Sequence, residues 1–211
     1  ASDVYKRQNF KFDFTLSSNS LCTPLLAFDI NKDANIAFGL NITNKVDSLS
    51  KSNFVGMMDA NLMDNSKLDM VLTQQGVNLS RSDINISLNG DYSTFNLTGI
   101  YFGREKQHKD ITACVNHNAE NTSSKQIIRG ILDDNSVGVY QGGIKVAPQA
   151  QKTDGQQMSR ALLLSKLAES NSKPELEIFA DDVSCAHGAT IGELNLSLIH
   201  ISEPTRPLYI S

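Results

Sequence analysis

The sequence predicts an all-β protein. Apolar and polar residues alternate with period 2 over many short segments, which is typical of strands with one buried face. Asn, Asp and Gly recur between these segments, where tight turns need residues that tolerate a left-handed backbone. No segment of helical periodicity interrupts the pattern before about residue 153. Short, evenly spaced strands fit a sandwich, a barrel or a parallel β-helix, and without a strict hexapeptide or nonapeptide repeat the three stay open.

The predicted strands follow one another along the chain. Each has an apolar side chain at every second position, so that one face can be buried. The clearest are residues 10–16, 36–42, 77–88 and 95–101. The turn signals are Asn31-Lys32-Asp33, Asp64-Asn65-Ser66, Asn89-Gly90-Asp91 and Asp133-Asp134-Asn135. Residues 153–170 differ, because Thr153 or Asp154 could cap a helix and good helix formers follow, so propensity alone predicts a helix there.

Composition excludes several classes of function. The net charge of −4 and the pI near 5.5 argue against nucleic acid as the main partner. No apolar run approaches the roughly 20 residues that span a bilayer, so no membrane partner is expected. The three cysteines, Cys22, Cys114 and Cys185, are odd in number and far apart. They form no disulfide framework and fit a reducing cytosol.

The two ends differ from the rest of the chain. Residues 1–8 and 196–211 match no folded pattern, and the tail resembles translated sequencing-adapter sequence. We therefore expect a non-native leader at 1–8, a folded core at 9–195 and a non-native tail at 196–211. The native protein would then continue at both ends, and this chain would be a fragment.

The densest group of reactive side chains lies in PELEIFADDVSCAHGATIG, residues 174–192. Cys185 and His187 are separated by one residue, so on a strand they point to the same side. A thiolate and an imidazole suit iron or an iron–sulfur cluster. Two side chains cannot close a metal site, so the remaining ligands must come from elsewhere in the chain or from a partner.

Other functions remain possible from the residues alone. Asp181 and Asp182 could serve a secreted or surface β-helix enzyme acting on carbohydrate, but adjacent strand residues face opposite sides, which favours a turn. An aromatic content of 7% without tryptophan also argues against a sugar-binding cleft. Cys114 and His117 could join the 185/187 pair in a Cys2His2 zinc site, although nothing in the sequence brings the pairs together. A purely structural β-solenoid would need none of these side chains.

Residues 180–192, ADDVSCAHGATIG, resemble the signature near the C-terminal end of the core of the SufB/SufD family, which are scaffold proteins of iron–sulfur cluster assembly. The run His187-Gly188-Ala189-Thr190, followed by Gly192, is similar to the SufD branch. The SufB branch usually has an acidic residue at the position of Gly188 and carries a cluster-ligating cysteine in a segment not found here. The resemblance continues through GGIKV (142–146), AQKTDGQ (150–156), LLLS (162–165) and PELEI (174–178), and more weakly through NHN (116–118) and SSKQ (123–126).

The resemblance implies a fold. The family core is a right-handed parallel β-helix, and the family's terminal helical regions would be missing from this chain. Residues 153–170 would then form further coils, with 162–164 in a strand, and we follow this implication over helix propensity. Each coil buries its apolar face only by stacking on its neighbours, and an open end exposes strand edges. We therefore expect the chain to be poorly soluble unless it is paired.

The resemblance also implies a function. The chain would be a non-catalytic subunit of a SufBCD-type scaffold complex in the cytoplasm, or in the plastid stroma of a eukaryote. It would pair with a SufB-like paralogue and supply His187, with Cys185, to a transient iron–sulfur cluster at their interface. ATP hydrolysis would belong to a SufC-type ABC ATPase, since this chain has no Walker A motif. The family's SufC-binding helical segment follows the HGAT run, so the chain by itself should bind SufC poorly. His117 matches a recurring family histidine.

Overall fold

The computed structural model describes residues 7–44 and 51–193, which form fourteen strands and no helix. No helix in this part of the chain is therefore long and apolar enough to cross a membrane. The strands are β1 Arg7–Leu16, β2 Leu21–Cys22, β3 Leu25–Ile30, β4 Asn35–Asn44, β5 Asn53–Leu62, β6 Lys67–Gln74, β7 Leu79–Leu88, β8 Thr94–Gly103, β9 His108–His117, β10 Ser123–Leu132, β11 Val137–Val146, β12 Asp154–Leu163, β13 Glu169–Ile178 and β14 Ser184–Glu193.

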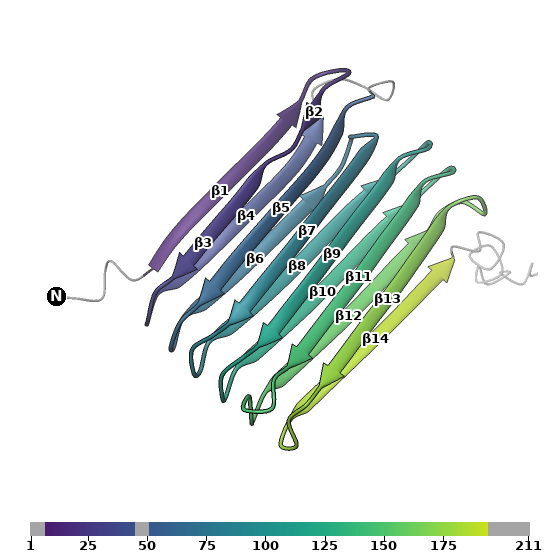
Figure 1. The fold of residues 1–211 in the computed structure, drawn as a ribbon. Helices are drawn as coiled ribbons and strands as arrows, with labels where there is room; N and C mark the ends of the chain where they lie inside the picture. The colour runs from purple at the N-terminus through teal and green to yellow at the C-terminus, as the bar shows by residue number, and fades with distance from the viewer. Residues whose placement is uncertain (1–6, 45–50, 194–211) are drawn as a thin grey trace, which may run out of the picture.

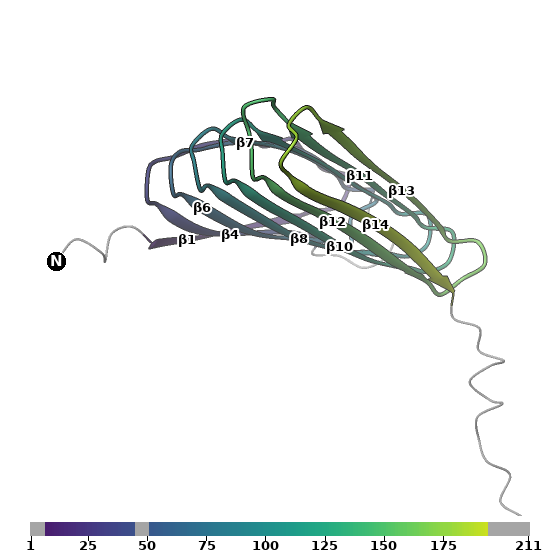
Figure 2. The same ribbon diagram turned by 90° about the horizontal axis from the view of Figure 1, so that it is seen from below.

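The strands form two parallel seven-stranded sheets that face each other (Figures 1 and 2). Sheet A has the order β1-β4-β6-β8-β10-β12-β14, and sheet B runs from β13 through β11, β9, β7 and β5 to β2 and β3. From β4 onward, consecutive strands alternate between the sheets, so each coil gives one strand to each. This winding is a flattened parallel β-helix, as the family resemblance implied, and of the three architectures left open by the residues only this one has the observed topology.

Corner residues of successive coils stack on one another. Asp33 donates its backbone N–H to the carbonyl of Asp64 at 2.9 Å, and Asn65 donates to Asp91 at 2.8 Å. Both donors have positive φ, which Asn and Asp tolerate. Tyr92 and Lys152 also have positive φ, although their side chains do not favour it. At those two corners the stacking of neighbouring coils, rather than local preference, fixes the turn.

The core lies between the sheets and changes character along the stack. Inward positions of the early and middle coils are mostly large and apolar, such as Phe38, Leu72, Phe95 and Ile111, although polar residues such as Gln74 and Lys109 are also buried there. Inward positions of the later coils of sheet A include buried Ser124, Gln126, Gln157 and Ser159. The inward side of sheet A therefore becomes more polar toward β14, whereas an apolar cluster that includes Ile144 and Val146 remains at this end of the stack.

Residues 153–170 contain no helix: they form β12, a turn at 164–168 and the start of β13, so the expected strand at 162–164 is found except for Leu164. β12 covers residues 154–163 and pairs in continuous register with β10 and β14. Helix propensity gives way because a helix would leave the edges of both neighbouring strands unpaired inside the stack. Residues 1–6 of the expected leader and the whole expected tail, 196–211, lie outside the described residues.

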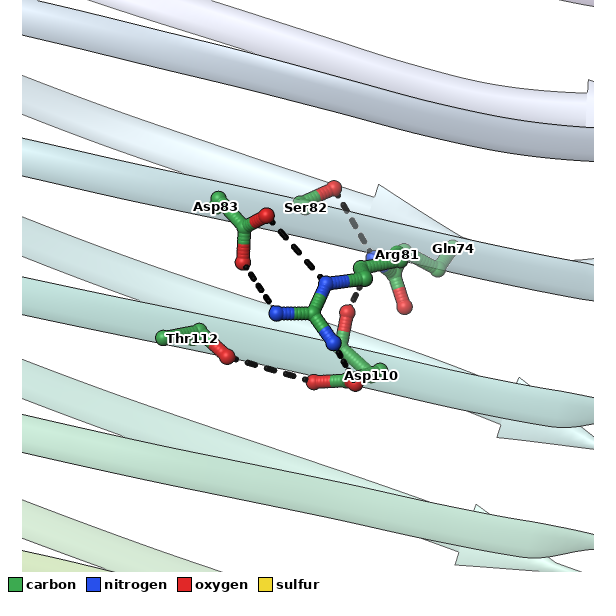
Figure 3. Close-up of polar contacts among 6 residues, drawn as sticks. All are labelled: Gln74, Arg81, Ser82, Asp83, Asp110 and Thr112. Carbon is green, nitrogen blue, oxygen red and sulfur yellow. Dashed lines mark hydrogen bonds and ion pairs between the residues drawn. The ribbon is translucent and has the colours of Figure 1, made fainter.

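A charged network joins neighbouring coils on sheet B (Figure 3). The Arg81 guanidinium donates to both carboxylate oxygens of Asp83, at 3.0 and 3.2 Å, and to Asp110 at 3.3 Å. The Asp110 side chain is only 8% exposed, and burial raises its pKa although Arg81 opposes that effect. Thr112 donates a further bond to Asp110. Arg81 thus compensates a carboxylate that the stack has largely removed from water.

Replacing Arg81 with alanine is expected to destabilise the fold by about 1–3 kcal/mol, because it leaves the buried Asp110 carboxylate without its counter-ion. The midpoint of urea unfolding measures this loss. Lys145→Ala is the control, because the Lys145–Glu177 pair is 50% exposed on both sides and such pairs contribute about 0–1 kcal/mol. Equal effects of the two changes would show that Asp110 does not depend on Arg81.

Candidate functional site

Strand β14 places Cys185 and His187 on the interior-facing side of sheet A. Cys185 lies in register with Gly155, and His187 with Gln157, a residue buried between the sheets. β14 pairs only with β12, and no further coil covers it among the described residues. His187 is consequently exposed and Cys185 half-buried. The shared side chain direction predicted from the one-residue spacing is confirmed.

The Cys185 thiol sits at the edge of a small apolar cluster. It packs against a group that contains Ile144 and Val146, and its Sγ would lie 3.2 Å from a Cβ at Gly155. Burial raises the pKa of Cys185, although a backbone hydrogen bond from Gly155 partly opposes this. The free thiol is therefore protonated at neutral pH. A bound metal ion would displace that proton, so binding here would release a proton and weaken in acid.

A polar layer lies directly beneath His187 inside the solenoid. The Tyr140 hydroxyl donates to Oε1 of Gln126 at 2.9 Å. Gln157, one coil nearer to β14, is 3% exposed, and neither its Oε1 nor its Nε2 has a hydrogen-bond partner. Gly142 lies opposite, where a Cβ would come within 3.0 Å of Gln157 Oε1. The space left by Gly142 is therefore shared by the Tyr140 ring, which comes nearest, and the Gln157 amide oxygen.

The polar layer formed by Gln126 and Gln157 was not predicted from the sequence. The signal was present, because Gln126 lies in phase with Ile128 on one strand and Gln157 in phase with Ala161 on the next. A polar residue at an inward position of a strand needs a partner or a role. The pattern alone did not reveal that the two glutamines and His187 occupy the same position in three successive coils.

The structure excludes the Cys2His2 zinc site. Cys114 faces outward on sheet B, whereas Cys185 faces the interior on sheet A. His117 points inward, and its two ring nitrogens lie 2.7 Å from Thr122 Oγ1 and 2.8 Å from Ser124 Oγ. Burial lowers the pKa of His117 to about 4, so it is a neutral structural residue. Across residues 7–44 and 51–193, no three His, Cys, Asp or Glu side chains gather closely enough to hold a metal ion.

Asp181 and Asp182 form the corner between β13 and β14. The Asp182 N–H donates to Oε1 of Gln151 at 2.9 Å, and its carbonyl accepts from the N–H of Lys152. Both aspartates are exposed. These contacts fit the expected turn and give no support to a carbohydrate-cleaving carboxylate pair.

Comparison with known proteins identifies the family to which the chain is similar. Residues 7–199 match the family model described as SUF system FeS cluster assembly, SufBD core domain. The chain is 39% identical over 115 residues to the iron–sulfur cluster assembly protein SufD of Escherichia coli, which is 54% of this chain and 27% of that protein. It is 26% identical over 152 residues to SufD of Bacillus subtilis, 71% of this chain and 35% of that protein.

A plant relative is similar as well. Protein ABCI7, chloroplastic, of Arabidopsis thaliana is 32% identical over 130 residues, 61% of this chain and 27% of that protein. The chain thus spans about a third or less of the length of these three relatives. The resemblance read from the HGAT motif is confirmed, including its SufD-like character.

Proposed function

The chain belongs to the SufBD core family of the SUF iron–sulfur cluster assembly system, and we propose that it is the core of a scaffold subunit that helps to hold a nascent cluster at an interface with a paralogous subunit. The supporting observation is the position of Cys185 and His187. They share one face of β14, at the end of the described stack. Iron and sulfide are the cargo of this site.

The two side chains have complementary parts in this proposal. His187 is exposed, and a neutral imidazole offers one nitrogen lone pair to iron. Cys185 binds as a thiolate once its proton is displaced. Two ligands leave the coordination of iron incomplete, so a partner supplies the rest. A site divided between two subunits can be assembled or opened by a rigid-body movement of one against the other.

The end of the stack also provides the surface for pairing. β13 and β14 each have one neighbour among the described strands, so each presents an edge to which another strand can hydrogen bond. The partner in this proposal is a SufB-like paralogue that extends these sheets. A SufC-type ATPase drives the movement, and the present chain itself is non-catalytic. The cytoplasm is the proposed location, or the plastid stroma for a eukaryotic protein, as the chloroplastic relative's name suggests.

His187→Ala tests the proposal in the full-length protein, co-expressed without oxygen with its paralogue and the ATPase. We expect iron, sulfide and visible absorbance in the purified complex to fall about tenfold or more, while the subunits still co-purify, because an iron ligand has been lost. His108→Ala is the matched control, since it removes a histidine from the outer side of β9. An unchanged cluster in the His187 variant would make this chain a purely architectural partner.

A further inference from the structure

The buried amide of Gln157 has no role in the fold that its contacts explain. The side chain is 3% exposed, and both its oxygen and its nitrogen lack a partner. A buried polar group without a hydrogen bond destabilises the fold, so its presence calls for another role. Gln126, its neighbour in the stack, does not share this problem, because it accepts a bond from Tyr140. The polar layer is therefore satisfied on one side of Gln157 and unsatisfied on the side of β14.

His187 is the next side chain on that side. Gln157 and His187 are Cα partners in adjacent parallel strands, and both lie on the interior-facing side. Side chains at paired positions of neighbouring strands stand about 5 Å apart, which is within reach of a hydrogen bond between a glutamine amide and an imidazole. In the structure the two side chains are not bonded to each other, and among the described residues the His187 ring has no other hydrogen-bond partner that would compete.

We propose that Gln157 is a positioning residue for His187: when His187 binds iron, the unpaired Gln157 amide turns so that its Oε1 accepts the ring N–H, which leaves the other ring nitrogen to the metal. This proposal rests on the function proposed above for His187. Histidines that bind metals almost always donate their second ring N–H to an oxygen, which fixes the tautomer and the ring orientation. Gln157 supplies such an oxygen from the buried side of the site.

The opposite sheet provides a control position for this role. Ser172, on β13, also has a buried hydroxyl without a partner, but it pairs in register with Tyr140 and not with His187. Ser172 is thus the same kind of unsatisfied group at a place that does not adjoin the proposed iron ligand, and it provides a matched control.

The test measures the affinity of Fe(II) alone, without oxygen, for the full-length protein in its complex. Gln157→Leu is expected to weaken binding 10- to 100-fold without lowering the melting temperature, because the lost amide was unpaired in the apo fold. Ser172→Ala should leave the affinity unchanged. In a His187→Ala background, Gln157→Leu should cause no further loss, since the two residues act as one unit. Gln157→Met serves as a second apolar variant if the leucine variant does not fold.

Each contrary result has a distinct meaning. An unchanged affinity in the Gln157 variants would overturn the positioning role, and so would an equal loss with and without His187. An unchanged affinity in His187→Ala alone would overturn the function proposed for the site. Gln157→Glu adds a conservative check, because a carboxylate can accept the same ring N–H and should keep most of the affinity.

Discussion

Replacing Lys109 with methionine is expected to stabilise this protein by about 3 kcal/mol at pH 6. Lys109 is 0% exposed, and its ammonium donates to the carbonyl of Val77. Burial lowers its pKa from 10.5 to about 7. Each pKa unit corresponds to about 1.4 kcal/mol, so charging this lysine opposes folding by about 4–5 kcal/mol. The lost hydrogen bond to Val77 reduces the net gain of the methionine variant by about 1 kcal/mol.

The sign of the pH dependence follows from the pKa of Lys109 in the folded state, about 7, and in the unfolded state, 10.5. Below pH 7 the lysine carries its proton in both the folded and the unfolded state, so the folded state bears the full cost of a buried charge. Between pH 7 and 10.5 only the unfolded state keeps the proton, so the stability of the natural protein rises with pH. The advantage of Lys109→Met should therefore be largest below pH 7 and nearly gone by pH 10.5.

Urea unfolding at pH 6, 8 and 10 measures this effect. The midpoint for Lys109→Met should exceed that of the natural chain most at pH 6 and least at pH 10. Lys125→Met is the control, since Lys125 is exposed on β10 and its replacement should shift the midpoint little at any of the three values. A lower midpoint for Lys109→Met at pH 6, or a gain that does not depend on pH, would show that the ammonium is well accommodated in the core.

The sequence revealed strands where the inward positions are large and apolar. β8, for example, buries Phe95, Leu97 and Tyr101 at alternate positions, and the pattern 95–101 predicted it. β5 and β11 were harder to recognise because glycine occupies inward positions, as at Gly56 and Gly142. Those positions are small because a ring from the same strand fills the space, namely Phe54 and Tyr140. Such packing is a property of the stack and leaves little local signal.

The candidate site was likewise predictable from the sequence only in part. The spacing of Cys185 and His187 was sufficient to place both side chains on one side of a strand, because that relation is local. The match of Gln157 with His187 depends on the lengths of strand β13 and of the two corners that flank it, which together set which residues of β12 and β14 pair. No residue-level rule gives that register across 30 positions of sequence, so the polar layer became visible only in the folded stack.

Gly90→Ala is expected to have the largest destabilising effect, about 3 kcal/mol or more. Gly90 lies buried in the corner between β7 and β8 and donates its N–H to the carbonyl of Leu62 at 3.0 Å. A Cβ at this position would overlap the backbone of Met63 and Asp64 in the preceding coil. Backbone cannot rotate away as a flexible side chain can, so the two coils must separate at this corner.

The consequence should extend beyond one corner, because a solenoid is stabilised by the contacts between neighbouring coils. A break at Gly90 weakens the link between the coils before it and those after it, so unfolding should begin there and lose cooperativity. Calorimetry would show a lowered and broadened transition. Gly39→Ala is the matched control, since the nearest atom to its Cβ would be Lys11 Cγ at an ordinary 3.7 Å. If both variants had the same melting transition, the close approach of the two coils would not explain the need for glycine at position 90.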